Sequence, residues 1–413
     1  MSATTSDHVF QDDRLAKRNV IALVAAQGFL GAQMPLTFVM GGLAGQMLAA
    51  NPVLATLPIS VIVLVSAFSA PLISLLMARA GRKAGFYLGV VAGGVGAAIS
   101  AYAIVLGSFA LFCFGHALTG IYMAAQGFYR FAATDTASPD FRPKAISWVM
   151  AGGLASAIIG PQIVIWFGDA IAPFQFAGAY AMAAVLNVLG LGIIATLKLP
   201  KPPRREKGAP SGRPMKQILR QPAVITAMIC GMVSYALMNL MMTSAPLAVV
   251  GCGFTTDMAA SVVSWHVIAM FAPSFFTGNL IARFGVEKII ALGLLILFAA
   301  GLTALSGVDV FQFYTALILL GVGWNFGFIG ATSLLASAHT PEERGKVQGL
   351  NDFLVFGLVA IASFSSGGLM NGVGAGDAVL GWTAVNLAMV PFLVLAGGTL
   401  LWFVLRRPTF EEA

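Results

Sequence analysis

Two pairs of soft donor side chains lie at helical spacing inside long apolar runs of this sequence. His266 and Met270 are four residues apart in WHVIAM, and Met238 and Met242 are four residues apart in MNLMM. Residues i and i+4 of an α-helix share one face, so each pair presents both donors on the same side. Thioether and imidazole groups suit copper, and especially Cu(I). The spacing therefore predicts a pocket that binds a soft metal ion.

The two pairs are also predicted to lie at one depth in a helical hairpin. If the chain turns near Cys252, Met238 precedes the turn by fourteen residues and His266 follows it by fourteen. At about 1.5 Å per helical residue, and with a few residues in the turn, both lie roughly 15 Å below the surface. The competing interpretation is that the methionines are ordinary packing residues.

Six further sulfur or imidazole groups are weaker candidates for the same chemistry. They are Cys113, His116, Met123, Cys230, Met232 and Cys252. In FCFGHALTGIYM, Cys113 and His116 are three residues apart and Met123 follows seven beyond His116, so all three lie near one helix face. They are candidates for a second station of the metal. A structural role, in which His116 bonds to a neighbouring helix, is the alternative.

Long apolar segments must position these side chains. Of 413 residues, 58% are hydrophobic and 9% are charged, and the mean hydropathy of +0.89 lies outside the range of soluble domains. About twenty apolar residues cross a hydrocarbon core of about 30 Å as a helix. We expect an all-α membrane protein with twelve transmembrane helices, at residues 19–41, 53–78, 84–105, 107–130, 144–168, 174–197, 221–248, 257–282, 287–306, 310–337, 346–371 and 379–405.

The placement of the charges predicts the orientation of these helices. All 23 Lys and Arg residues fall in the N-terminal tail, in the even-numbered loops or at the C-terminal end, whereas the odd-numbered loops carry only aspartates. By the positive-inside rule both termini are then cytoplasmic. The net charge of +7 therefore reports topology and not a nucleic-acid partner.

A Pro-rich basic stretch divides the chain into two halves. We expect an N-terminal tail at 1–18, a six-helix half at 19–197, a cytoplasmic linker at 198–220, a second six-helix half at 221–406 and a tail at 407–413. SLLMARAGRK at 74–83 aligns with GNLIARFGVE at 278–287 at a shift of 204, and SPDFRPKA at 138–145 aligns with TPEERGKV at 340–347 at a shift of 202. Two matches at nearly one shift indicate an internal repeat.

Two parallel six-helix halves joined by a cytoplasmic linker resemble the major facilitator superfamily. The signature loop of that family, G-x-L-x-D-R-x-G-R-K, is recognisable in SLLMARAGRK, which keeps Arg79, Gly81 and Arg82 but has Ala78 in place of the Asp. In the family this loop gates the cytoplasmic side. The resemblance implies that Asp352 supplies the missing negative charge to Arg79 or Arg82. The alternative is that Asp352 faces interfacial water.

Within this superfamily, MNLMM followed by WHVIAM resembles the CcoA-type copper importers of bacterial inner membranes. The resemblance implies that Met238, Met242, His266 and Met270 are required for copper uptake, which supplies the assembly of cbb-type cytochrome oxidases. Cys230 and Cys252 resemble family thiols. We therefore expect a secondary transporter that imports copper by alternating access, with copper as its substrate and with no permanently bound cofactor.

Two other functions remain open. One is an importer of a small organic molecule such as riboflavin, whose flat ring would stack on Trp148, Trp265, Trp324 or Phe328. The other is a membrane receptor or assembly factor that does not transport. The sequence holds no Walker, H-E-x-x-H or C-x-x-C motif, so we expect neither an enzyme nor an ATP-driven pump. A monomer is expected.

Overall fold

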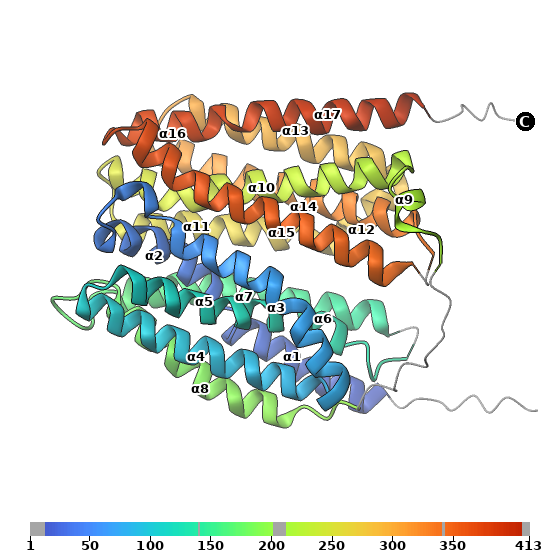
Figure 1. Cartoon of the computed structure of the whole chain (residues 1–413), viewed down its shortest axis with the longest axis horizontal. Helices are drawn as coiled ribbons and strands as arrows, with labels where there is room; N and C mark the ends of the chain where they lie inside the picture. The colour runs from blue at the N-terminus through green and yellow to red at the C-terminus, as the bar shows by residue number, and fades with distance from the viewer. Residues whose placement is uncertain (1–12, 139–140, 201–211, 341–342, 407–413) are drawn as a thin grey trace, which may run out of the picture.

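The helices of this protein form two bundles that lie side by side (Figure 1). The computed structural model describes residues 13–138, 141–200, 212–340 and 343–406, and every regular element in these ranges is helical. The N-terminal bundle comprises α1 (Asp13–Phe29), α2 (Gln33–Leu48), η1 (Pro52–Leu54), α3 (Leu57–Ala80), α4 (Arg82–Leu106), α5 (Phe109–Gln126), α6 (Tyr129–Ala132), α7 (Arg142–Phe167) and α8 (Ala177–Thr196). The C-terminal bundle comprises α9 (Met215–Ile218), α10 (Pro222–Gly251), α11 (Thr256–Phe271), α12 (Ser274–Phe284), α13 (Val286–Leu305), α14 (Val310–Ser337), α15 (Arg344–Gly367), η2 (Gly368–Val373), α16 (Ala378–Leu387) and α17 (Met389–Leu405).

The apolar helices account for twelve spans. Among the described residues, 11 helical segments are long and apolar enough to cross a membrane, and the bent pair α11 and α12 makes up to 12. The predicted all-helical fold with twelve transmembrane helices is therefore confirmed. Parts of the predicted tails and linker, at 1–12, 201–211 and 407–413, lie outside the described residues.

The eighth span is bent where the sequence predicts one continuous helix over 257–282. It divides into α11 and α12, which meet at an angle of 41°. Pro273 lies at the break and has no N–H to continue the hydrogen-bond ladder. Asn325 of α14 donates from Nδ2 to the Met270 carbonyl and to Ser274 Oγ, both at 2.7 Å. This amide satisfies a carbonyl at the break and thereby fixes the position of Met270.

The two copies of the repeated loop adopt the same backbone conformation. Gly81 joins α3 to α4 with φ 93° and ψ 160°, and Gly285 joins α12 to α13 with φ 88° and ψ 150°. This backbone region is essentially restricted to glycine. Equal geometry at a shift of 204 supports the internal repeat.

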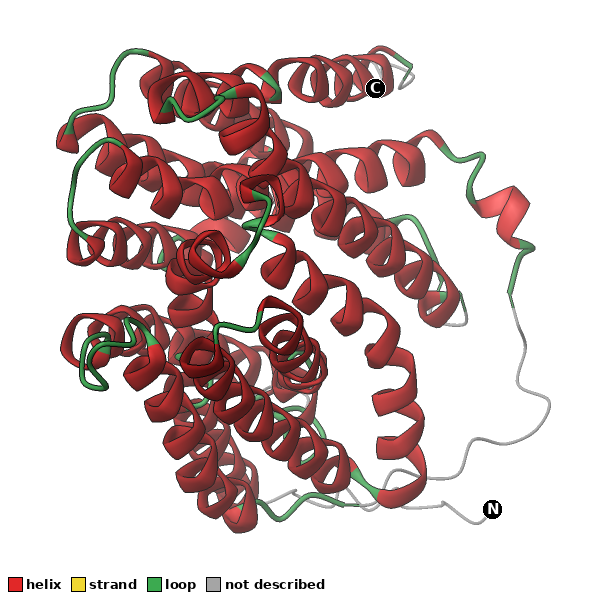
Figure 2. Ribbon diagram, turned by 60° about the vertical axis from the view of Figure 1, so that its left-hand side comes forward, coloured by secondary structure: helices red, strands yellow, loops and turns green. Residues whose placement is uncertain are grey.

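The two bundles meet at one end of the molecule. We define the linker end as the end that holds α9, the start of α1 and the end of α17, on the right of Figure 1, and the loop end as the opposite end. At the loop end α2 packs against α10 and α11, and η1 packs against η2. Between the same bundles, α7 packs on α11 and α3 on α15. Figure 2 shows the same two bundles in a turned view.

Hydrogen bonds between the two bundles hold the loop end closed. The Thr56 hydroxyl, which is fully buried, donates to the Ser363 carbonyl at 2.8 Å and accepts from the Gly367 N–H at 3.0 Å. Asn371 donates from Nδ2 to the Pro52 carbonyl at 2.8 Å. Each of these bonds joins one bundle to the other, so the loop end cannot open without breaking them.

Candidate functional site

A cavity of about 380 Å³ lies between the two bundles. This volume falls within the about 300–1,000 Å³ that small-molecule sites occupy. The lining comes from the junction of α1 and α2 and from α3, α5, α6, α7, α10, α11, α14 and α15. Arg130 and Asp352 belong to the lining toward the linker end, and both are exposed to solvent. The cavity is therefore accessible from the linker end and closed at the loop end.

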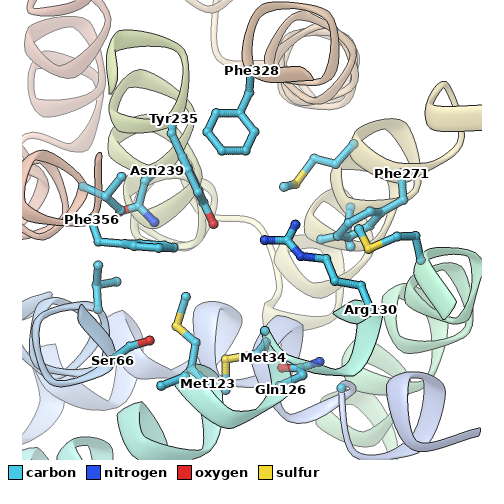
Figure 3. Close-up of a pocket in the computed structure, with 18 of the residues that line it drawn as sticks. Met34, Ser66, Met123, Gln126, Arg130, Tyr235, Asn239, Phe271, Phe328 and Phe356 are labelled. Carbon is cyan, nitrogen blue, oxygen red and sulfur yellow. The ribbon is translucent and has the colours of Figure 1, made fainter. Parts of the chain in front are cut away.

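The C-terminal bundle supplies an aromatic wall to this cavity. Trp324 and Phe328, one helical turn apart on α14, are stacked with ring centroids 5.4 Å apart and an interplanar angle of 12°. The ring of Tyr235 on α10 lies 5.5 Å from Trp324 and 5.1 Å from Phe328. Phe356 of α15 lies 5.8 Å from Tyr235, and Phe271 of α11 lies 6.3 Å from Trp324. Figure 3 shows Tyr235, Phe328 and Phe356 on this side of the cavity.

The N-terminal bundle supplies a softer and more polar opposite wall. Met34, Met123 and Gln126 lie across the cavity from Tyr235 in Figure 3. Ser66 of α3 belongs to the same lining. Thioethers adapt to irregular shapes and contact aromatic faces favourably. A flat ligand can therefore contact both aromatic rings and methionine side chains in this cavity.

The C-terminal bundle contributes a polar side chain as well as aromatic rings. The Nε1 of Trp324 is buried rather than exposed to the cavity, and among the described residues nothing accepts a hydrogen bond from it. Asn239 of α10, also in the lining, is 2% exposed and its Oδ1 accepts from the Thr243 hydroxyl at 3.4 Å. A mainly apolar pocket with a small number of placed polar groups is typical of sites for small organic ligands.

The structure divides the four residues of the predicted metal pocket. Met238, Met242 and Met270 line the cavity, as their shared helix faces predict. His266 is fully buried, and the hydrogen bond of its Nδ1 with the Leu317 carbonyl of α14, at 2.7 Å, turns the ring toward that helix. It is not part of the cavity lining. The predicted meeting of imidazole and thioethers in one pocket is therefore not observed.

The flanking sulfur groups also lie apart from the cavity lining. Cys230 is buried and its Sγ donates to the Ala396 carbonyl of α17 at 3.7 Å. Met232 packs against a small cluster that includes Val63 and Val355. Cys252 lies in the turn after α10, where burial and then the Asp377 carboxylate raise the pKa of its thiol. A raised pKa disfavours the thiolate that binds metals.

The second predicted cluster is likewise divided. His116 is 1% exposed, and its Nδ1 lies 2.9 Å from the Phe112 carbonyl while its Nε2 lies 3.1 Å from the Tyr180 hydroxyl. The contact with Tyr180 joins α5 to α8 inside the N-terminal bundle. Met123 lines the cavity, whereas Cys113 and His116 do not. The contact of His116 with Tyr180 fits the alternative in which this histidine bonds to a neighbouring helix.

The predicted gate residues take other partners in this conformation. Arg82 forms an ion pair with Asp135, with 2.9 Å between Nε and Oδ2. Asp352 lines the cavity, and its carboxylate accepts from the Asn351 amide at 3.2 Å. Among the described residues, no hydrogen bond or ion pair joins Asp352 to Arg79 or Arg82, which flank Gly81, so the gate stays a prediction.

The aromatic wall was only partly predicted. Trp324 and Phe328 line the cavity, whereas Trp148 and Trp265 are 46% and 52% exposed and lie outside the lining. Tyr235, Phe356 and Phe271 were missed. Tyr235 lies three residues before Met238 on α10, so the helical spacing that selects the methionines also selects this ring.

The metal-ligating side chains do not gather elsewhere either. Within the part of the chain that the structure describes, no three His, Cys, Asp or Glu side chains are placed to hold a metal ion. The cavity lining offers aromatic faces, thioethers, amides and the charged side chains of Arg130 and Asp352.

This fold and this central cavity place the chain in a known family of membrane transporters. The family model of the Major Facilitator Superfamily matches residues 20–364 and 227–413. The chain belongs to the major facilitator superfamily. The resemblance to the major facilitator superfamily that the sequence shows is thus confirmed.

Relatives within the family are similar over nearly their whole length. The riboflavin transporter RfnT of Brucella anthropi is 46% identical over 386 residues, which cover 93% of this chain and 95% of that one. The uncharacterized MFS-type transporter YddS of Bacillus subtilis is 28% identical over 413 residues, with 96% and 93% covered. The crystal structure of the nucleoside transporter NupG superposes with a TM-score of 0.70 at 13% identity, over 95% of this chain and 100% of that one. A bacterial homologue of the human lysosomal transporter Spinster, in an inward-facing conformation, superposes with a TM-score of 0.65 at 12% identity, over 96% and 99%.

The similarity to RfnT overturns the prediction of a copper importer. The relative that is 46% identical along almost its full length is a riboflavin transporter and not a copper importer of the CcoA type. In this structure Nδ1 of His266 bonds to the Leu317 carbonyl of α14, and His266 does not belong to the cavity lining that the three thioethers share. The predicted small-molecule alternative fits better than the metal-binding prediction.

Proposed function

We propose that this protein transports riboflavin across the membrane by alternating access. The observation that carries the proposal is the 46% identity to the riboflavin transporter RfnT over 93% of the chain. The cavity supports it independently, because a flat, largely apolar ring system requires the aromatic faces that Tyr235, Trp324 and Phe328 present. The amide of Asn239, which belongs to the lining, can bond with ring heteroatoms.

The charges of the chain support an orientation in the membrane. The positive-inside rule assigns the linker end to the cytoplasmic side, and the bacterial relatives RfnT and YddS support a bacterial plasma membrane. The structure, with its cavity accessible from that end, then represents the inward-facing state. In the outward-facing state the ligand enters from the loop end, and closure of that end by Thr56 and its partners precedes release inward.

Uptake by a bacterial strain that cannot synthesise riboflavin tests the proposal. Expression of the wild-type chain should restore growth on low external riboflavin and the uptake of radiolabelled riboflavin. Phe328→Ala removes one stacking face and should weaken binding about 5- to 150-fold, since an aromatic–base stack contributes about 1–3 kcal/mol. Phe311→Ala, at a ring that is 74% exposed and outside the lining, is the matched control.

Two outcomes decide against the proposal. Uptake no greater than in cells without the chain would refute riboflavin transport. Binding of riboflavin to the purified protein without any flux into vesicles would favour the receptor alternative.

A further inference from the structure

Two opposite charges face each other across the cavity. Among the described lining residues, Arg130 and Asp352 are the two that carry a charge. Arg130 belongs to α6 of the N-terminal bundle and Asp352 to α15 of the C-terminal bundle. Figure 3 shows the guanidinium of Arg130 extending into the cavity toward the Tyr235 hydroxyl. The lining as a whole therefore has a net charge of zero.

The two charges act on each other through the cavity. Asp352 and Arg130 are close enough for a mutual electrostatic interaction, and Tyr235 also interacts with Arg130. No hydrogen bond between the two side chains is found in the described part of the chain. The carboxylate accepts from Asn351, and the guanidinium lies over the Phe131 ring with 4.9 Å between the charge centre and the ring centroid. Donors of Arg130 thus remain directed at the cavity while Asp352 opposes the approach of an anion.

The nearby cations at the linker end are engaged outside the cavity. Arg82 is paired with Asp135, and Lys83 donates to the Ala195 carbonyl at 3.0 Å. Neither belongs to the lining. Arg130 is thus the cation of the described lining that would meet an anionic ligand, and Asp352 decides whether its charge is available.

We propose that Asp352 sets the charge selectivity of the cavity, so that it accepts riboflavin and rejects the phosphate monoester of riboflavin. This inference rests on the proposed function. A phosphate monoester carries about −1.5 to −2 charges at neutral pH. An arginine alone would bind it through paired charge-assisted hydrogen bonds. The Asp352 carboxylate repels the same phosphate and cancels that attraction.

This selectivity has a consequence for the direction of net transport. The cavity is accessible from the end that we assign to the cytoplasm. A transported molecule that has gained a phosphate monoester on that side would then re-enter the cavity less readily than riboflavin itself.

The test compares the binding of two flavins to the purified full-length protein. Riboflavin and flavin mononucleotide are titrated separately by flavin fluorescence, and the ratio of their dissociation constants is the readout. For the wild type this ratio should favour riboflavin by about tenfold or more. Asp352→Asn should lower the ratio at least about tenfold, because Arg130 gains an unopposed charge. The ratio of the two dissociation constants is also unaffected by a change in the conformational equilibrium that alters the binding of both flavins equally.

Two further variants locate the effect. The double variant Arg130→Gln with Asp352→Asn should lose the gain in binding of flavin mononucleotide. Asp257→Asn, which makes the same charge change at an exposed position in the first turn of α11, should leave the ratio as in the wild type.

Each remaining outcome has a defined meaning. An unchanged ratio in Asp352→Asn overturns the inference alone, as does a wild type that binds both flavins equally or an equal effect of Asp257→Asn. Absence of riboflavin binding in the wild type refutes the proposed function, and the inference falls with it.

Discussion

Removal of the Thr56 hydroxyl should shift the protein toward its loop-open conformation. Thr56→Val keeps the shape of the side chain and deletes its hydrogen bonds to the Ser363 carbonyl and the Gly367 N–H, at 2.8 and 3.0 Å. Both partners belong to the opposite bundle. The bonds exist only while the loop end is closed, because opening separates η1 from η2 and exposes these groups to water.

The size of the shift follows from the number of bonds lost. A buried hydrogen bond contributes about 0.5–1.5 kcal/mol net, so two bonds stabilise the closed loop end by about 1–3 kcal/mol. The population ratio of open to closed should therefore rise about 5- to 150-fold in Thr56→Val. Gly367→Ala should act in the same direction, because its Cβ would lie 2.6 Å from Thr56 Oγ1 and 2.7 Å from the Val53 carbonyl.

Distances between spin labels at Leu106 and Phe311 measure this shift. These residues are exposed, lie in opposite bundles at the loop end and stand outside the contact between η1 and η2. In a background whose three cysteines are replaced, Thr56→Val should enlarge the long-distance population. Thr383→Val is the matched control, because its hydroxyl bonds to the Val379 carbonyl within its own helix at 2.8 Å.

The reasoning fails if the distance distributions of Thr56→Val and the wild type coincide. It fails equally if Thr383→Val produces a shift of the same size. Either result would mean that the hydrogen bonds between the bundles at Thr56 do not control the opening of the loop end.

Three further predictions concern stability, each measured as the thermal unfolding midpoint of the purified protein. Gly81→Ala places a Cβ at φ 93° and ψ 160° and should lower the free energy of unfolding by about 1–3 kcal/mol. Gly192→Ala, in open space on α8, should raise the free energy of unfolding by roughly 0.5–1 kcal/mol. Equal unfolding midpoints of the two variants would contradict this prediction. Hydrogen bonds from the Arg213 guanidinium lower the pKa of the buried Glu343 carboxyl. The stabilisation of the fold by the ionised carboxylate is therefore complete above the ordinary pKa of 4.5 and is lost as the pH falls toward the lowered pKa. The difference in unfolding midpoint between the wild type and Glu343→Gln should shrink below pH 4.5, and a difference that stays constant with pH would be contrary evidence. His266→Leu should lower the free energy of unfolding by about 0.5–1.5 kcal/mol, because the hydrogen bond to the Leu317 carbonyl is lost. The affinity for riboflavin should stay as in the wild type. A large loss of affinity would show that His266 belongs to the binding site.

The helices could be predicted because hydropathy is a local property. The tenth span was predicted at 310–337, and α14 runs over Val310–Ser337. The repeat could also be predicted, because Gly81 and Gly285 require the same backbone conformation and so keep the same loop sequence around them. In both cases the residues that set the structure are neighbours in the chain.

The bend in the eighth span depends on a distant residue. Pro273 within the apolar run signals a break, but a proline alone does not decide between a kink and two separate segments. Asn325, 55 positions after Met270, supplies the amide that satisfies the freed carbonyl. Hydropathy and spacing do not show which polar residue reaches the break.

For the candidate site, the sequence predicted which residues share a face of one helix, but it did not predict contacts between helices. Spacing placed Met238 and Met242 on one face of α10, and both line the cavity. The same spacing put His266 on the face of Met270, yet the ring turns to the Leu317 carbonyl because a buried Nδ1 needs a partner. The contact lies between α11 and α14, so no pattern within α11 reveals it.

The chemistry of the pocket depends on all of its walls together. Three thioethers on two adjacent helices suggest a soft metal when they are considered alone. The same thioethers beside the stacked rings of Trp324 and Phe328 form a deformable apolar surface that suits a flat organic molecule. The aromatic rings come from α10, α11, α14 and α15, which only the folded bundle brings together. Because a transported ligand must be released again, a wall of many weak contacts also fits transport better than a set of strong metal bonds.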